Sequence, residues 1–220
     1  MNPPLDRDLI AAGCGGRFGS RITVFRETGS TNDIVLRVAE GGEEEGFVAF
    51  AESQTRGRGQ FGRRWSSAPG LGLWFSALIR PKWPTALLPQ ITPLVAVSVA
   101  ESLAAISGLT IRIKQPNDIL HAGRKLAGIL SEARTGGEVF VALGIGINVN
   151  HARADFPLEL QASASSLALE TGRTWERERV AAAVLHGLES AYDPACAPGE
   201  DVLEKYAALS RGEVCDSFPP

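Results

Sequence analysis

The 220-residue sequence predicts an α+β fold, in which helices pack on a mixed but mostly antiparallel sheet. Short runs rich in β-branched and aromatic residues alternate with longer segments whose apolar residues recur at helical spacing. A Gly-Gly pair joins two of the short runs, as in an antiparallel hairpin. With 44% hydrophobic residues, a chain of this length has enough apolar surface for the core of one substantial domain.

The predicted strands are short apolar runs bounded by turn residues. In chain order they cover 21–25, 47–53, 71–81, 111–114, 124–134 and 138–150. Pro81 ends the third run because proline cannot donate to a strand ladder. Gly136 and Gly137 make the turn between the last two strands. The QPNDIL segment at 115–120 is predicted as a turn, because Pro116 forces an extended residue before it and Asn and Asp favour tight turns.

Helices are predicted where apolar residues recur every three to four positions. The first begins near Ser30 or Thr31, either of which is suited to accept hydrogen bonds from the backbone N–H groups that follow. The long apolar segment at 87–107 contains a buried helix in its second half, which Gly108 ends. Residues 151–172 are expected to form a loop with a short helix. Two further amphipathic helices are predicted at 176–192 and 200–210.

Several common signals are absent. There is no run of 18 apolar residues, and the start, MNPPLDRDLI, has no basic region followed by an apolar one, so neither a membrane span nor a secretory signal is expected. The cysteines are scattered and form no metal-binding pattern, which favours a reduced, cytoplasmic protein without metal ligands. The GxxxxGK[ST], GxGxxG, HExxH and GxSxG patterns are missing. A net charge of −3 argues against general nucleic-acid or membrane-surface binding.

The first candidate binding motif is QTRGRGQFGRRW, residues 54–65, which holds four arginines, three glycines and no acid. Its glycines let backbone N–H groups approach a ligand, and arginines pair with phosphate oxygens in a two-pronged geometry. Because such a loop repels itself, we expect it to become ordered around an anion and to exclude water from what it covers. An RGG-like RNA-binding tail or a flexible linker is the competing interpretation, which the flanking strands and the final Trp65 disfavour.

The second motif is KQPNDILHAGRKLAGIL, residues 114–130. Lys114 and Asp118 fall at the end of a predicted strand, and Lys125 falls at the start of the next. A lysine in a covered anionic site holds a carboxylate or phosphate oxygen. Gly128 implies close backbone packing beneath such a site. The PND triplet on its own is equally explained by a turn.

Two shorter motifs complete the set. In GSTND, residues 29–33, a helix N-terminus offers hydroxyl and amide groups. Helix capping alone would explain Ser30 but says less about Thr31 and Asn32. In GIGINVN, residues 144–150, alternating Gly and Ile place small residues on one face of a strand, where something flat has room to lie. Ordinary close sheet packing is the alternative for this motif.

In this order and spacing, GSTN, AESQTRGRGQFGRRW, KQPNDIL, GRKLAGIL and GIGIN resemble the catalytic domain of biotin protein ligases, also called biotin–[acetyl-CoA-carboxylase] ligases. The resemblance covers about residues 22–192. It implies a two-step reaction. The biotin carboxylate attacks the α-phosphate of ATP, giving biotinyl-5′-AMP and pyrophosphate, and the adenylate then acylates a lysine of biotin carboxyl carrier protein, the acetyl-CoA carboxylase subunit. Mg²⁺ is expected with ATP.

The resemblance also implies roles for single residues. Lys125 resembles the lysine that bridges the biotin carboxyl and the phosphate. Asp118 resembles the group that helps to deprotonate the carrier lysine, whose unperturbed pKa is about 10.4. Asn117 is similar to a contact on the adenylate or Mg²⁺ side. The candidate catalytic residues are Lys125, Arg58 and Asp118. The candidate binding residues are Ser30, Thr31 and Asn32 for the biotin ring, Gln54 for its ureido side, and Gly57, Gly59, Gln60, Arg63, Trp65, Lys114, Asn117, Gly128, Gly144, Gly146 and Asn148 for the rest of the two ligands.

This sequence departs from the family pattern in three respects. Position 115 is Gln where the family usually has Trp, so a flat apolar wall is lost. Position 60 is Gln where many members have Arg, which removes a phosphate partner. The family normally continues into a small β-barrel domain, which we expect to be absent from this sequence. We therefore expect an N-terminal extension at 1–20, a catalytic domain at 21–210 and only a C-terminal remnant at 211–220. The short extension predicts no helix-turn-helix and no DNA binding, and an exposed sheet edge would support a homodimer.

Three alternatives stay open at this point. A lipoate or octanoate transferase of the same superfamily would share the lysine but not the GRGRG loop. A non-catalytic relative that binds biotin or biotinyl-AMP would release no pyrophosphate from ATP. An RNA-binding module would show a salt-sensitive affinity for RNA, although a single arginine loop on an acidic chain is a poor electrostatic footprint.

Overall fold

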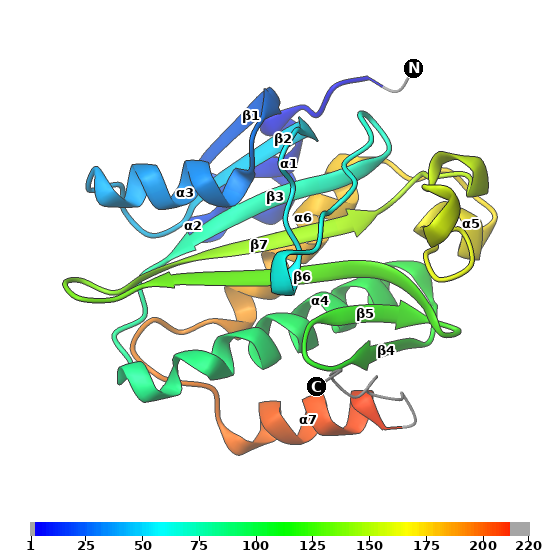
Figure 1. Cartoon of the computed structure of the whole chain (residues 1–220). Coiled ribbons are helices and arrows are strands. Elements are labelled where there is room, and N and C mark those ends of the chain that lie inside the picture. Colours follow the sequence, from blue (N-terminus) through cyan, green and yellow to red (C-terminus); the bar gives the residue numbers. More distant parts are fainter. Residues whose placement is uncertain (1–2, 212–220) are drawn as a thin grey trace.

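The computed structural model describes residues 3–211, and its strands join in one seven-stranded sheet (Figure 1). The strands are Arg21–Thr28 (β1), Phe47–Gln54 (β2), Gly72–Ile79 (β3), Ile111–Lys114 (β4), Asp118–His121 (β5), Arg124–Arg134 (β6) and Phe140–Asn148 (β7). Their order across the sheet is β1-β2-β3-β7-β6-β5-β4. β1 and β2 run parallel, and the other neighbouring pairs are antiparallel. The predicted α+β fold with a mixed, mostly antiparallel sheet is therefore confirmed.

The helices cover both faces of this sheet. They are Arg7–Cys14 (α1), Gly16–Ser20 (α2), Thr31–Glu40 (α3), Ile91–Ser107 (α4), Leu167–Thr171 (α5), Arg177–Ala191 (α6) and Glu200–Ser210 (α7). Short 3₁₀ turns lie at Gln60–Gly62, Thr85–Gln90, Arg153–Asp155 and Leu158–Leu160. α3 packs on one face over a small apolar cluster, while α1, α2, α4 and α6 bury the main core on the other face (Figure 1). Residues 212–220 of the predicted C-terminal remnant lie outside the described residues.

The strand β3 is buried along its whole length because helices cover both of its faces. Leu73 and Phe75 belong to the main core, whereas Leu78 packs under α3. This double coverage explains why LWFSALI is a continuous apolar run rather than an alternating one. Ser76 is the polar exception in that run. It is fully buried, and its hydroxyl lies beside Thr31, the first residue of α3.

The helix α4 is the most apolar element of the chain. The stretch Thr85–Ser107 is long and apolar enough to cross a membrane by length and composition alone, and half of its apolar window is buried inside the protein. Leu94, Val99 and Leu103 lie in the main core beside α6 and the sheet. Gly108 ends the helix in a left-handed conformation, as predicted.

Two features differ from the sequence-based prediction. The turn predicted over QPNDIL ends earlier than expected, because Asp118–His121 forms strand β5, which lies between β4 and β6 in the sheet. The first 20 residues, for which no element was predicted, form α1 and α2 and pack against α6. Asp6 caps α1 by accepting from two backbone N–H groups, and Ile10, Cys14 and Phe18, four residues apart, give the buried face.

The N-terminal segment is tied to the body of the protein by a buried ion pair. Arg177 on α6 is 4% exposed and pairs with Glu52 at 2.8 Å. Its guanidinium also donates to the carbonyls of Gly72 and Pro3. Glu52 in turn accepts from the backbone N–H of Leu5 at 2.5 Å. A single carboxylate thus joins β2, α6 and the chain that leads into α1.

Arg177→Ala is expected to lower the free energy of unfolding by about 3 kcal/mol, because it leaves the Glu52 carboxylate buried without its cation. Urea unfolding followed by circular dichroism measures this change. Arg179→Ala is the matched control, since that side chain is 82% exposed and its pair with Glu176 is expected to contribute little. Equal effects of the two substitutions would contradict the stabilising role assigned to the buried pair of Arg177 with Glu52.

Candidate active site

The predicted motifs meet on the face of the sheet that carries α3. The loop between β2 and β3 crosses over β7 and β6 on this face (Figure 1). Gly144 of β7 faces Asn32 at the start of α3, and Gly146 faces Trp65 of the loop. Lys125 of β6 places its amine 5.0 Å from the centre of the Trp65 ring. Residues that are far apart in the sequence therefore surround one patch of the sheet.

A cluster of hydroxyl and amide groups forms one end of this patch. The Ser76 hydroxyl lies 2.7 Å from Thr31 Oγ1 and 2.5 Å from Asn32 Oδ1, within hydrogen-bond distance of both. Gln54 Oε1 accepts from the backbone N–H of Thr31 at 2.9 Å. The amide nitrogen of Gln54 donates to Ser67 at 3.1 Å. Thr31, Asn32 and Gln54 are thus brought together as predicted, and Ser76 joins them.

The predicted side-chain cap at the start of α3 is wrong. Ser30 occupies the N-cap position in an extended conformation, but its side chain makes no capping hydrogen bond. The N–H of Thr31 is instead satisfied by Gln54 from the neighbouring strand. The motif therefore connects α3 to β2 through a long-range contact rather than through local capping, and Ser30 itself is buried beside the cluster.

A strip of glycines forms the floor of the patch. A Cβ added at Gly144 would lie 2.4 Å from Asn32, and one added at Gly146 would lie 2.5 Å from the Trp65 ring. Gly128, the cross-strand neighbour of Gly146, faces the same ring at 2.7 Å. These approaches are too close for any side chain. The predicted flat group over the GIGIN strand is the indole of Trp65.

The arginine loop folds back on itself. Trp65 donates its backbone N–H to the carbonyl of Gly57 at 2.9 Å, and Gly59 donates to Arg63 at 2.7 Å. A Cβ at Gly57 would lie 2.7 Å from the Trp65 carbonyl, so this close approach requires glycine. Gln60 begins a single 3₁₀ turn at the tip, and the side chain of Arg63 is exposed there.

Arg58 is held by two carboxylates. Its guanidinium donates to both oxygens of Asp33, at 2.6 and 3.0 Å, and to Glu132 at 3.1 Å. The hydrogen bonds from Arg58 lower the pKa of the Asp33 carboxyl below its usual value, and the bond to Asp33 raises the pKa of Arg58. The carboxylates of Asp33 and Glu132, which lie outside the loop, therefore neutralise the charge of Arg58. The expected self-repulsion of the loop took account only of residues within the loop.

Lys125 is paired with an acid. Its amine lies 2.5 Å from Asp118 Oδ1, and both side chains are between one fifth and one third exposed. The amine also sits over the Trp65 ring, in cation–π geometry. Asp118 is the cross-strand neighbour of Gly128 on one side and of Lys114 on the other. The structure thus brings the predicted Lys125 and Asp118 together at the edge of the glycine strip.

Asn117 holds the turn before Asp118 in place. Its side-chain amide donates to the carbonyl of Ile129 at 2.7 Å, and its own carbonyl accepts from the N–H of Ile129 at 3.1 Å. The hydroxyl of Tyr206 on α7 donates to the carbonyl of Pro116 at 2.8 Å. Both contacts fix the backbone that presents Asp118. The predicted contact of Asn117 with the adenylate or Mg²⁺ stays a prediction.

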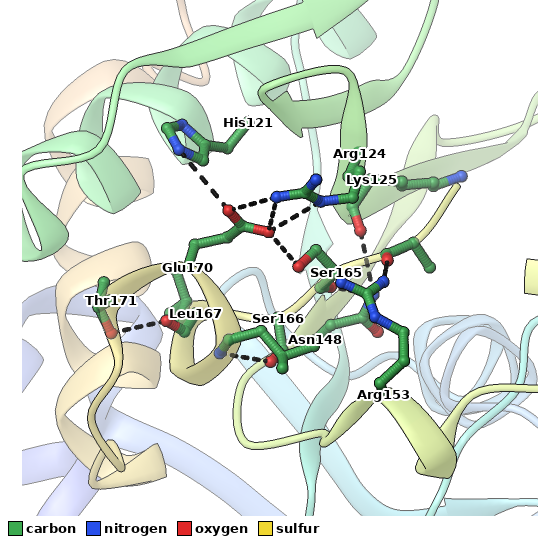
Figure 2. A network of polar contacts seen from close by, with 12 residues as sticks. His121, Arg124, Lys125, Asn148, Arg153, Ser165, Ser166, Leu167, Glu170 and Thr171 are labelled. Carbon is green, nitrogen blue, oxygen red and sulfur yellow. Dashed lines mark hydrogen bonds and ion pairs between the residues drawn. The ribbon is translucent and has the colours of Figure 1, made fainter. Parts of the chain in front are cut away.

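The backbone of Lys125 is held from the side by residues 163–165, of which Ser165 is labelled in Figure 2. Lys125 donates its N–H to Ser163 at 2.8 Å and accepts from the N–H of Ser165 at 2.9 Å. Asn148, at the end of β7, donates from its amide to the carbonyls of Lys125 and Ser165. The predicted Asn148 therefore supports Lys125 through its main chain.

One buried carboxylate organises this brace. Glu170 on α5 has a side chain that is 8% exposed, and it accepts from Nε and Nη2 of Arg124 and from the hydroxyl of Ser165 (Figure 2). Burial alone would raise the pKa of Glu170, but the hydrogen bonds from Ser165 and Arg124 outweigh it, so the pKa lies below its usual value. Glu170 thus holds Arg124, which precedes Lys125 in the chain, and Ser165, whose N–H donates to the carbonyl of Lys125.

Glu170→Ala is expected to lower the free energy of unfolding by about 2 kcal/mol, because Arg124 and Ser165 lose their shared acceptor. Amide hydrogen exchange at Lys125 and Ser165 is expected to speed up more than exchange elsewhere in β6. Glu159→Ala, on the neighbouring exposed 3₁₀ turn, is the control. Unchanged exchange at Lys125 in the Glu170 variant would show that the brace does not depend on this carboxylate.

Five residues of this region were not predicted. They are Asp33, Ser76, Glu132, Ser165 and Glu170. Ser76 left a signal in the sequence, as a polar residue inside a continuous apolar strand. Glu132 left a weaker one, as an acid shortly after the apolar run of β6. The other three lie on a helix or a loop where a polar residue is ordinary, and their contacts depend on the folded chain.

A model of the Biotin/lipoate A/B protein ligase family matches residues 24–150, more than half of the chain, and these residues include the polar cluster, the arginine loop, Lys125 and the glycine strip. The chain belongs to this family. The family resemblance predicted from the five motifs is therefore confirmed.

Named relatives agree with this membership. The bifunctional ligase/repressor BirA of Bacillus spizizenii is 39% identical over 165 residues, which are 74% of this chain and 51% of that protein. The biotin–[acetyl-CoA-carboxylase] ligase of Mycobacterium tuberculosis is 38% identical over 210 residues, covering 86% of this chain and 71% of that protein. A structure of the Aquifex aeolicus biotin protein ligase with biotin and ATP superposes with a TM-score of 0.67 at 31% identity, over 87% of this chain and 73% of that one. This family member spans about half the length of the Bacillus protein.

Proposed function

We propose that the chain is an ATP-dependent biotin protein ligase, which forms biotinyl-5′-AMP and transfers biotin to a lysine of a carrier protein. The observation that carries this proposal is the placement of the polar cluster, the glycine strip and the Lys125 amine on one face of the sheet. A ligand with a polar ring, an apolar chain and a terminal carboxylate fits, in this order, the polar cluster, the Trp65 indole that covers the glycine strip, and the Lys125 amine. Biotin has this arrangement.

The polar cluster supplies the groups that a ureido ring needs. A ureido carbonyl accepts and its two N–H groups donate, so the ring requires both kinds of partner. The hydroxyls of Thr31 and Ser76 and the amides of Asn32 and Gln54 offer both kinds at close quarters. The groups of the cluster already bond to one another and to the protein, and a ureido ring offers partners for the lone pairs and N–H groups that these bonds leave over, whereas a ring without polar atoms offers none. This favours biotin over lipoate, whose ring has no amide groups.

Lys125 is assigned to the first chemical step. The biotin carboxylate and the ATP polyphosphate are both anions and repel each other. An ammonium group between them offsets this repulsion and stabilises the charge that develops when a carboxylate oxygen attacks the α-phosphorus and pyrophosphate leaves. To serve this step, the Lys125 amine exchanges its bond with Asp118 for bonds to the substrates.

Asp118 is then assigned to the second step. The carrier lysine attacks the carbonyl carbon of the mixed anhydride as a neutral amine, an amide bond forms and AMP leaves. The attacking nitrogen must lose a proton, and we assign its acceptance to the Asp118 carboxylate, which lies beside Lys125 at the edge of the site. Trp65 and the loop that carries it cover the site, and this exclusion of water protects an adenylate that hydrolyses readily.

We propose that Mg²⁺ enters the site bound to the phosphates of ATP. Among residues 3–211, no group of three or more His, Cys, Asp or Glu side chains is placed to hold a metal ion. Mg²⁺ commonly keeps its waters and binds substrate phosphates. The proposed partner is the biotin carrier of an acetyl-CoA carboxylase, in line with the name of the Mycobacterium relative. A homodimer, the lack of DNA binding and a cytoplasmic location remain predictions.

The test is calorimetric titration of the purified chain with biotin, then with lipoate, followed by a pyrophosphate assay with biotin, ATP and Mg²⁺. We expect biotin to bind much more tightly than lipoate and pyrophosphate to be released in a biotin-dependent way. Tight binding without pyrophosphate would support the non-catalytic alternative, and preference for lipoate would support the transferase.

A further inference from the structure

The arginine loop is anchored to the sheet and to α3 at two levels. At its base, Arg56 donates its backbone N–H to the carbonyl of Gly29 at 2.8 Å. Further along, Arg58 reaches Asp33 on the first turn of α3 and Glu132 near the end of β6. Asp33 and Glu132 are 99 residues apart by their numbers, so a single side chain joins three separate segments.

The same contacts reach the polar cluster. Glu132 Oε2 accepts from the Asn32 side chain at 2.6 Å and from Arg58 at 3.1 Å. Asn32 also donates to the carbonyl of Leu130. The carboxylate of Glu132 therefore links the loop arginine to the residue that faces Gly144 at the floor of the site.

The charges around Arg58 are opposite to those of a phosphate site. The Arg58 guanidinium already donates to two carboxylates, and a phosphate would have to compete with them for its N–H groups. No ion pair within the described range 3–211 involves Arg56, Arg63 or Arg64, and all three side chains are exposed. These three arginines are better placed to meet the polyphosphate than Arg58 is.

We propose that Asp33 and Glu132 are positioning residues that hold Arg58, and with it the 54–65 loop, over the Asn32 end of the site. Arg58 then acts as a latch that retains the ligand ring, and the contact with phosphate falls to the other arginines of the loop. The retention of biotin rests on the proposed function, whereas the anchoring of the loop does not.

The latch is tested with trypsin, which cleaves after arginine and needs locally unfolded chain. In the double variant Asp33→Asn with Glu132→Gln, we expect cleavage between residues 56 and 64 to become about tenfold faster in the absence of ligands. We expect biotin to dissociate about tenfold faster from the same variant, while the KM for ATP changes little. The single variant Asp33→Glu keeps the carboxylate and is expected to keep most of the protection of the loop against trypsin.

Glu40→Gln, at the other end of α3, is the control and is expected to leave cleavage of the loop unchanged. Unchanged cleavage in the double variant would overturn the proposal. A lowered melting temperature without preferential cleavage in the loop would also overturn it, because the acids would then only stabilise the fold. A wild-type chain that fails to bind biotin would contradict the proposed function, and the cleavage assay would still test the latch.

Discussion

Lys125→Ala is expected to reduce biotin-dependent pyrophosphate release by about a thousandfold, because it removes the cation between the two reacting anions. The free energy of unfolding is expected to change by less than about 1 kcal/mol, since the pair with Asp118 is partly exposed and the other contact of the amine is with the partly exposed ring of Trp65. The backbone contacts of Lys125 with Ser163 and Ser165 do not depend on its side chain. Pyrophosphate release at saturating ATP, with parallel urea unfolding, separates the two effects.

Two companion variants make this result specific. Lys125→Arg keeps a positive charge on a longer, planar group and is expected to recover a small part of the rate. Lys205→Ala removes a lysine of α7 that is 55% exposed and paired with Glu101 of α4, and it is expected to leave the rate unchanged. Pyrophosphate release close to the wild-type rate in Lys125→Ala would exclude the assigned role.

The sequence predicted the fold well where a segment's burial determined its composition. The bounds of β6 were predicted residue by residue, and β3 and α4 were predicted from their continuous apolar runs. The strand β5 was missed because four residues beside a proline are too few to show alternation. The helices α1 and α2 were missed because their buried face is carried by three side chains spread over nine residues.

The site could be predicted only in part, for a related reason. Lys125, Asp118 and the glycines lie in compact motifs, so their spacing in the sequence already indicates their proximity. Asp33 and Glu132 become partners of Arg58 only through the pairing of β6 with β7 and the placement of α3 on that pair. No local pattern encodes such a contact. The same argument holds for Glu170, whose link to Arg124 spans 46 positions.

Gly146→Val is expected to weaken biotin binding by at least about a hundredfold, because a branched side chain would displace the Trp65 indole, against which we place the apolar chain of biotin. A Cβ at this position would lie 2.5 Å from the Trp65 ring, so the indole must move or the strand must shift. Trp65 belongs to a partly exposed loop, and we therefore expect the ring to move and the sheet to keep its register. Biotin titration and tryptophan fluorescence measure the two consequences.

Gly137→Val is the matched control, since a Cβ in that turn between β6 and β7 would meet nothing within 4 Å. If Gly146→Val unfolds the chain, the strip of small residues is needed for packing of the sheet, and the smaller Gly146→Ala then decides whether a ligand also uses it. If Gly146→Val folds and binds biotin as the wild type does, the ligand does not depend on the position of the indole. Loss of binding in a folded variant with a displaced Trp65 would mean that the ligand packs against the indole that the glycines at 128 and 146 hold close to the sheet.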